Sequence, residues 1–399
     1  MTYEYVPLGS IADITKLAGF EFAQYMKYTD TGEIIALRAL NLRDGQLDLT
    51  DVKRIDKSIS ELLPRSKLYE GDILLTYTGN GYGDCALIEE NDKYHLAPNI
   101  CKIKPDPKKV DSYFLYLYVR SRDFYNQMRN HIVGSSQPTI PMKTIRLLKI
   151  PYPSMDVQKR ISSVIRPINE KIKINQKIND NLEQQAATYF QELFINNANS
   201  MWQIGTISDL GTVVGGSTPS KTKPEYYTDN GIAWITPKDL SINKSKFISH
   251  GENDITELGL KNSSATVMPK GTVLFSSRAP IGYIAIASDE VTTNQGFKSV
   301  VPYSEVGTAF VYFFLKHSLP VIEGAASGST FKEISGSAMK NIPAIVPDRS
   351  TLDQFNSFCA PIFAQQKILE DQNHSLAMLR DSLLPKLMSG AIDIASIQL

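Results

Sequence analysis

The stretch Gly134–Pro153, GSSQPTIPMKTIRLLKIPYP, aligns without a gap on Gly328–Pro347, GSTFKEISGSAMKNIPAIVP, at an offset of 194 residues. Two further segments recur in the same order: LGSIADI at 8–14 as IGTISDL at 204–210, and LYEGDILL at 68–75 as MPKGTVLF at 268–275. Three matches in one order at nearly one offset indicate an internal duplication. The chain is therefore predicted to contain two copies of one structural unit.

The segment that follows each copy has the pattern of a long helix. Apolar residues recur there at seven-residue spacings, which is typical of a helical seam that packs against another helix. The predicted seam residues are Ile161, Ile168, Leu182, Tyr189, Phe355, Ile362, Leu369, Leu376 and Leu383. In the repeat alignment, Asn175 occupies the position equivalent to Leu369. Proline is costly inside a helix but tolerated at its first position. We therefore expect a short helix at 156–165, then long helices from Pro167 to Asn196, about 45 Å, and from Pro361 to Ser389.

The two globular parts are rich in β-branched and aromatic residues, interrupted by turn residues as in NLRDGQLDL and YYTDNGIAWIT. Such a pattern predicts many short strands. The fold class is therefore mixed α/β, a tandem duplication of a strand-rich domain followed by a long helix. The predicted boundaries are 1–153 and 200–347 for the domains, and 154–199 and 348–399 for the helical regions.

Composition restricts the possible partners and the compartment. Lys plus Arg (42) balance Asp plus Glu (42), so no global positive field favours nucleic acid, and any DNA contact needs a local patch or a partner's charge. The three cysteines are far apart and form no CxxC pair, as expected in a reducing cytoplasm. The N-terminal residues lack a signal-peptide pattern, and no apolar run approaches membrane-spanning length. We expect a soluble, cytoplasmic protein.

One glycine-rich loop, in LLTYTGNGYGDCAL at 74–87, resembles the loops that bind phosphates or S-adenosylmethionine. The duplication provides a control, because its counterpart SRAPIGYIAI at 277–286 keeps one glycine and inserts Pro280. A phosphate-binding loop lies between a strand and a helix, whereas both of these loops lead into predicted strands. The loop is therefore interpreted as a hairpin turn, with Gly83 matching Gly282.

No other catalytic pattern is convincing. The five histidines form no metal-binding spacing, so no metal site is expected. The Asp-Pro-Pro-Tyr and Asn-Pro-Pro-Tyr tetrapeptides of amino-methyltransferases are absent, and so are GxSxG and a Walker loop. KPDPKKVD at 104–111 weakly resembles the core of restriction nucleases but has no repeat partner. The chain is not expected to be an enzyme by itself.

Four segments of the second half carry a more specific signal: GGSTPSKTKPEYYTDNGIAWITPKDL (215–240), GTVLFSSRAPIG (271–282), TTNQGF (292–297) and GSTFKEIS (328–335). With the tandem plan, they closely resemble the specificity subunit of Type I restriction–modification systems. The first half departs from them, with TKLAGFEFAQYMKYTDTGEIIALRALNL in place of the glycine-serine-threonine-proline motif and LAPNICK in place of TTNQGFK. Divergence of this kind is expected of two domains that read different sequences.

The resemblance implies a function and partners. Each strand-rich half would be a target-recognition domain that reads one half of a bipartite double-stranded DNA target. The two long helices would pair as an antiparallel coiled coil, giving a spacer with approximate two-fold symmetry. The implied partners are two methyltransferase subunits that carry S-adenosylmethionine and two ATP-driven (ATP/Mg) restriction–translocase subunits. The chain itself would hold no cofactor and would serve phage defence.

Base reading requires side chains such as Arg, Asn, Gln, Ser and Thr in loops. The candidate DNA-binding residues of the first domain are Arg38, Asn41, Tyr77, Asn80, Asn99, Ser135, Ser136 and Gln137. Those of the second are Ser217, Thr218, Lys221, Lys238, Arg278, Asn294, Gln295, Thr330 and Lys332. Structural roles compete with DNA contact: the GSSQPTI and GSTFKEI segments as turns, Asn294 and Gln295 as strand caps, and Arg278 as the partner of a carboxylate in its own domain.

Two other functions are compatible with the sequence. One is an enzyme, a fused DNA methyltransferase or nuclease with an unrecognised site. The other is an orphan scaffold that no longer recognises DNA. The missing methyltransferase motifs oppose the first, and the polar loops of the second half oppose the other.

Overall fold

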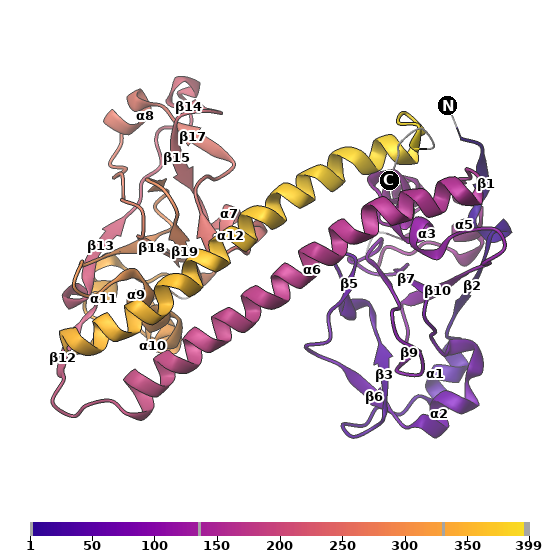
Figure 1. The fold of residues 1–399 in the computed structure, drawn as a ribbon, viewed down its shortest axis with the longest axis horizontal. Helices are drawn as coiled ribbons and strands as arrows, with labels where there is room; N and C mark the ends of the chain where they lie inside the picture. The colour runs from indigo at the N-terminus through magenta and orange to yellow at the C-terminus, as the bar shows by residue number, and fades with distance from the viewer. Residues whose placement is uncertain (1–2, 135–136, 329–331, 395–399) are drawn as a thin grey trace. The chain divides into compact units, whose positions relative to one another are not determined.

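The computed structural model describes residues 3–134, 137–328 and 332–394 (Figure 1). The chain divides into two compact units, 1–171 with 376–399, and 172–375. Each unit contains one strand-rich domain together with a part of each long helix. Within the described residues, no helix is long and apolar enough to cross a membrane.

The first domain is built on two sheets. A four-stranded antiparallel sheet has the order β2 (Ala12–Lys16), β10 (Ile100–Pro105), β7 (Ile73–Thr76), β8 (Cys85–Leu87). A three-stranded sheet has the order β6 (Lys53–Ile55), β3 (Ile34–Leu37), β9 (Tyr94–Leu96), with β3 and β9 parallel. The smaller pairs are β1 (Tyr5–Pro7) with β11 (Lys149–Pro151), and β4 (Leu42–Arg43) with β5 (Gln46–Leu47).

The helices of the first domain are α1 (Gly19–Tyr25), α2 (Lys57–Leu62), α3 (Ser112–Val119), α4 (Arg122–Arg129) and α5 (Met142–Leu147). The larger core of this domain joins α3 and α4 to the four-stranded sheet, because Phe114 and Phe124 are fully buried with Ile73 and Ile103. Burial of such aromatic and aliphatic side chains is the main driving force for this packing.

The second domain repeats this topology. Its five-stranded sheet has the order β13 (Gly211–Gly215), β21 (Lys298–Pro302), β18 (Val273–Ser277), β19 (Ile281–Ala287), β16 (Phe247–Ile248). Its other large sheet has the order β14 (Tyr227–Thr228), β17 (Asn253–Ile255), β15 (Ile232–Ile235), β20 (Thr292–Thr293). The central strand β15 pairs antiparallel with β17 and parallel with β20, as β3 does with β6 and β9. The predicted duplication is thus confirmed at the level of strand pairing.

The remaining elements of the second half are β12 (Gln203–Thr206), which pairs with β22 (Pro343–Val346), and short helices. These helices are α7 (Pro237–Ile242), α8 (Glu257–Lys261), α9 (Thr308–His317), α10 (Leu319–Gly324) and α11 (Gly336–Lys340). One core lies between the two sheets and includes Ile235, Leu274 and Phe297. A second core joins α9 to both long helices.

The long helices differ from the prediction at their prolines. α6 (Met155–Gln191) is one helix of 37 residues that contains Pro167, and α12 (Arg349–Met388) contains Pro361. The expected break before each proline was therefore wrong. Both proline residues are exposed, whereas Ile165, Ile172 and Ile362 nearby are buried, so tertiary packing on either side holds the helix together despite the missing hydrogen bond. At 1.5 Å per residue, α6 spans about 55 Å.

The ends of these helices follow local chemistry. α12 ends just before Gly390, which has a positive φ of 74° and is the residue that the sequence predicted as the stop. α6 continues into a π-helical turn, Glu192–Asn196.

Within residues 172–375 the two long helices run antiparallel. Asn175 Nδ2 lies 2.9 Å from Asn373 Oδ1, Gln366 Nε2 donates to Asn179 O at 3.1 Å, and Gln354 Nε2 donates to the Tyr189 hydroxyl at 2.7 Å. Partner numbers fall along α12 as they rise along α6, as antiparallel pairing requires. Seam residues also enter the domain cores: Phe355 and Ile362, with Leu182 and Tyr189 packed against them, in the second half, and Ile161, with Leu383 against it, in the first.

Candidate nucleic-acid interface

A hollow of about 410 Å³ lies in the second domain where three loops meet. It is lined by the loop after β13, by the start of α7, and by the loop after β20. Five of the predicted DNA-binding residues line it: Thr218, Lys221, Lys238, Asn294 and Gln295. The remaining lining residues are Trp234, Thr236, Pro237, Asp239, Glu252 and Asn253.

In the loop after β13, Gly216 and Ser217 pack closely against the backbone of Thr293 and Asn294 on the opposite side of the hollow. A Cβ atom on Gly216 would lie 2.0 Å from the carbonyl oxygen of Asn294, so only glycine fits there. Ser217 N donates to Thr293 O at 2.9 Å, and the indole of Trp234 donates to Ser217 O at 3.0 Å. Two motifs far apart in sequence are thus brought together by backbone contact.

Asp239 organises the rim at the start of α7. Its carboxylate accepts hydrogen bonds from the Thr236 N–H (2.7 Å), from the Thr236 hydroxyl (2.6 Å) and from the Glu252 N–H (2.8 Å). These contacts cap the helix and fix the 252 loop beside it. Lys238 forms an exposed ion pair with Glu252, and this hydrogen bond raises the pKa of the lysine. Because the pair is exposed, it can exchange for a phosphate contact at little cost.

Asn294 and Gln295 each make a hydrogen bond through the amide oxygen within the domain, and both side chains also line the hollow. Asn294 Oδ1 accepts the Gly296 N–H at 2.9 Å, which closes a turn after β20 and fixes the orientation of its amide. The Thr218 hydroxyl donates to Gln295 Oε1. A hydroxyl can donate or accept, so Gln295 can turn its amide to suit either kind of partner. Amide groups of this kind match the hydrogen-bonding edges of bases.

Another candidate of the second domain, Arg278, lies in the loop after β18. Arg278 pairs with Glu333 at 3.4 Å, and Lys298 reaches the same carboxylate at 3.8 Å. The structural alternative for Arg278, an internal ion pair, is therefore the arrangement found. Lys332 is exposed beside this pair, and Thr330 lies outside the described residues.

Two candidates of the first domain have structural contacts. Asn41 is fully buried: its Oδ1 accepts the Arg38 N–H at 3.0 Å, and its amide donates to Asp48 O (2.9 Å) and Asp51 O (2.8 Å). The Arg38 guanidinium donates to Asp51 O at 3.1 Å and pairs with the Asp51 carboxylate at 3.3 Å. In this structure Asn41 supports the loop at 48–51 and presents no free group, whereas part of Arg38 remains accessible.

Four further candidates of the first domain that the structure describes lie on or near the glycine-rich loop. Tyr77 N donates to Asn99 O at 3.2 Å, and Gly79 N donates to Pro138 O at 2.8 Å. The loop is the turn of the β7–β8 hairpin, as predicted, and Gly83 and Gly282 share positive φ angles of 92° and 95°. Asn80, Asn99 and Gln137 are exposed beside Tyr77, while Ser135 and Ser136 lie outside the described residues.

The two aspartates of KPDPKKVD at 104–111 make structural contacts. Asp111 caps α3 through the Phe114 N–H at 2.9 Å and also accepts the Ser162 hydroxyl of α6. Asp106 accepts the Lys108 N–H at 3.0 Å. Across 3–134, 137–328 and 332–394, no group of three or more His, Cys, Asp or Glu is placed to hold a metal ion.

Sequence reasoning missed six members of the hollow, among them Trp234, Asp239 and Glu252. Trp234 and Asp239 lie within IAWITPKDL, and the spacing of Thr236 and Asp239 is that of a helix cap. This signal predicts a helix start and no more. The approach of Glu252 depends on the tertiary fold and leaves no local pattern.

Comparison with known proteins agrees with this architecture. A family model described as the Type I restriction modification DNA specificity domain matches residues 1–184 and again 199–371. The Type I restriction enzyme HindI specificity subunit of Haemophilus influenzae is 22% identical over 96% of this chain and 98% of its own. The MjaIX specificity subunit of Methanocaldococcus jannaschii is 43% identical over 40% of this chain, which corresponds to 37% of that relative.

A crystal structure of the Type I restriction–modification S subunit from M. genitalium covers 97% of this chain and 96% of its own. Its TM-score is 0.61 at 16% identity, which establishes a shared fold. Two matches to one family model, in tandem and on duplicated domains, account for almost the whole length. The chain belongs to the Type I restriction–modification DNA specificity family and is a specificity subunit with two DNA specificity domains.

Proposed function

We propose that the chain reads a bipartite DNA target, with one half-site recognised by each domain. The observation that carries this proposal is the duplication of one scaffold with different polar loops on each copy. The second domain presents the hollow with Asn294, Gln295 and Thr218, whereas the first presents the exposed residues around Tyr77 and Asn99. Two different sets of readers on equivalent scaffolds suit two different half-sites.

We further propose that the chain is non-catalytic and acts in the cytoplasm as the assembly centre of a larger complex. Its partners would be two methyltransferase subunits and the restriction–translocase subunits. These partners would use S-adenosylmethionine and ATP with Mg²⁺, while this chain holds no cofactor. The balanced charge of the chain supports this division, because methyltransferase subunits that enclose DNA would share the phosphate contacts.

Methylome sequencing tests the proposal. A host without other modification systems would express the cognate methyltransferase subunit with the wild-type chain, with an Asn294→Ala/Gln295→Ala chain, or without the chain. We expect the wild-type chain to produce a new split motif, two short half-sites around a fixed gap. Loss of two amide readers should relax or abolish one half-site, by about 1–3 kcal/mol of discrimination per base, and leave the other unchanged.

The outcomes separate the candidate functions. Identical methylomes with and without the chain would contradict DNA recognition and favour the orphan scaffold. In a further strain that expresses the chain without the methyltransferase subunit, methylation would favour a fused methyltransferase. A matched control is Asn80→Ala in the first domain, which should affect only the half-site that Asn294→Ala/Gln295→Ala leaves intact.

A further inference from the structure

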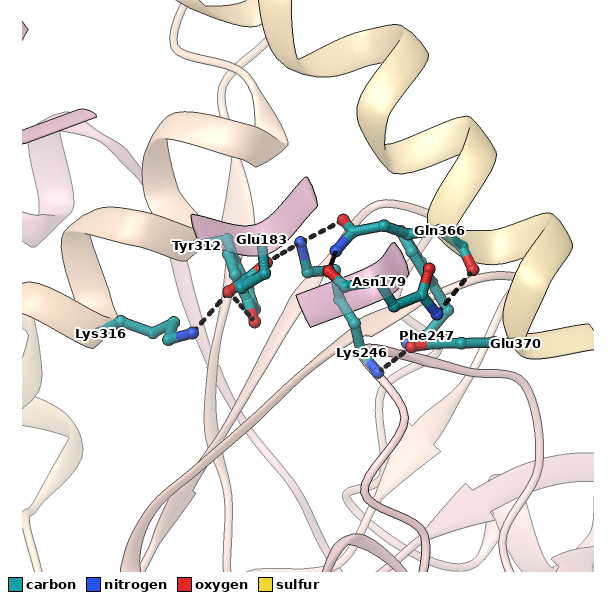
Figure 2. Close-up of polar contacts among 8 residues, drawn as sticks. All are labelled: Asn179, Glu183, Lys246, Phe247, Tyr312, Lys316, Gln366 and Glu370. Atoms are coloured by element: carbon teal, nitrogen blue, oxygen red, sulfur yellow. Dashed lines mark hydrogen bonds and ion pairs between the residues drawn. The ribbon is translucent and has the colours of Figure 1, made fainter. Parts of the chain in front are cut away.

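A buried lysine joins the second domain to both long helices (Figure 2). Lys246 immediately precedes the edge strand β16, and only 6% of its side chain is exposed. Its ammonium group pairs with the Glu183 carboxylate of α6 and donates to Gln366 Oε1 of α12 at 2.7 Å. One cation of the recognition domain therefore contacts both helices.

The backbone at the same position is held as well. The Glu370 carboxylate of α12 accepts the Lys246 N–H at 2.8 Å with one oxygen and the Phe247 N–H at 3.1 Å with the other. At the same level the helices are joined to each other, because Gln366 Nε2 donates to Asn179 O. The segment before β16 is thus fixed at its side chain and at its main chain.

Aromatic rings surround the lysine. Its Nζ lies 3.9 Å from the centroid of Phe363, 4.7 Å from that of Tyr312 and 5.4 Å from that of Phe313. Cation–π attraction is strongest where water is excluded, as it is here. Glu183 also accepts hydrogen bonds from Lys316 and from the Tyr312 hydroxyl of α9.

The protonation of this pair follows from its surroundings. Burial lowers the pKa of Lys246, although the Glu183 charge opposes that shift. Burial would raise the pKa of Glu183, but the ammonium groups of Lys246 and Lys316 lower it overall. We consider both groups charged, because Glu183 lies between two cations and the aromatic rings also favour the lysine cation.

A buried ion pair is weak evidence for stability, since apolar residues of similar size often stabilise a core as well or better. What distinguishes such a pair is its directionality. Its hydrogen bonds fix the orientation of the two joined elements, whereas apolar surfaces allow one element to slide along the other. The orientation fixed at Lys246 matters for the hollow because the two are close in the chain. Lys246 lies at the end of the short segment that follows α7, and α7 carries Lys238 and Asp239 of the hollow.

We propose that Lys246 is a positioning residue, which fixes the orientation of the hollow on the helix pair and thereby restricts the complex to one gap length between half-sites. This inference rests on the bipartite target proposed above. One added base pair moves the half-sites apart by about 3.4 Å and turns one by about 35° relative to the other. A domain released from this contact would tolerate neighbouring gap lengths.

The experiment measures methylation at plasmid sites that contain both half-sites at the natural gap and at gaps one or two base pairs shorter or longer. The host expresses the cognate methyltransferase subunit with wild-type chain, Lys246→Met, Glu370→Gln or Lys316→Met. Methionine fills the aromatic cage without directional contacts. We expect Lys246→Met to raise the ratio of shifted-gap to natural-gap methylation by about tenfold or more, with unchanged half-site sequences.

The other variants complete the test. Glu370→Gln keeps one acceptor for the backbone and should relax gap selection less than Lys246→Met; it also serves if Lys246→Met does not fold. Lys316→Met is the matched control, because this lysine reaches Glu183 from the surface with 43% of its side chain exposed, and it should keep wild-type selectivity. The inference is overturned if Lys246→Met and Glu370→Gln, with wild-type melting temperatures, select the same single gap. A wild-type chain that yields no split motif would instead overturn the bipartite function on which it rests.

Discussion

Tyr116 of α3 and Arg120, the residue that follows this helix, correspond in the duplication to Tyr312 and Lys316 of α9, yet the two pairs hold different parts of the molecule. In the first domain, the Tyr116 hydroxyl donates to Gly45 O at 2.6 Å and Arg120 donates to Asp44 O at 3.1 Å. Both contacts hold the turn of the β4–β5 hairpin. In the second domain, the corresponding side chains bind Glu183 of α6.

The first domain contacts its portion of the helices differently. The Tyr113 hydroxyl accepts Asn169 Nδ2 at 2.9 Å, and Arg380 donates to Asn169 Oδ1 at 3.2 Å. Arg166 covers the Tyr113 ring at 4.3 Å and is exposed. Within the described part of the chain, the carboxylate in this domain–helix contact, Asp111, accepts the Ser162 hydroxyl of α6 and pairs with no buried lysine there. Duplicated scaffolds thus keep their strand order and apolar core, while the polar contacts that join domain to helix diverge freely.

The largest expected difference is in the cost of removing a charge. Glu183→Ala leaves the buried Lys246 ammonium without its carboxylate, so we expect the free energy of unfolding to fall by about 3 kcal/mol. Lys316→Ala removes an exposed partner of the same carboxylate and should cost less than about 1 kcal/mol. Urea denaturation with amide hydrogen exchange of residues 172–375 measures both. Equal costs would show that the pair behaves as a surface ion pair.

A smaller effect distinguishes the two tyrosines. Tyr116→Phe leaves the half-buried Gly45 carbonyl without this donor, so we expect a loss of about 1–2 kcal/mol and faster exchange of the amides at 42–48. Tyr312→Phe should cost about 1 kcal/mol or less, because Glu183 retains two ammonium partners. A larger loss for Tyr312→Phe would reverse the comparison.

The smallest expected effect is a pH dependence confined to the first domain. His95 is fully buried between Leu63 O and Leu96 O, and burial lowers its pKa below the usual 6.5. A lowered histidine pKa contributes stability that is present above the unfolded value and is lost as the pH falls through the folded one. The protection factors of the β3 and β9 amides, which take out the intrinsic pH dependence of exchange, should therefore fall from pH 7 to pH 5 more than those of β15 and β20. His95→Gln should remove this slope, and a slope that persists would assign it to another group.

Several features were readable from residues alone. The repeat predicted equivalent domains, and the strand order of β2-β10-β7-β8 and of β13-β21-β18-β19 confirms it. Gly83, Gly282 and Gly390 were placed correctly because a positive φ has a local cause. The members of the hollow were partly predicted, since their residue types and loop positions suit base reading.

The sequence by itself determined the duplication, the helix seams, the hairpin at the glycine loop and the family. These features leave local or periodic patterns, because they reflect backbone geometry and burial on one face. Only the tertiary structure decided that α6 and α12 continue through Pro167 and Pro361, that Asn41 is buried, and that Lys246 meets Glu183. Such outcomes depend on packing energy and on charge pairs between residues far apart in the chain, and no short stretch of sequence encodes either.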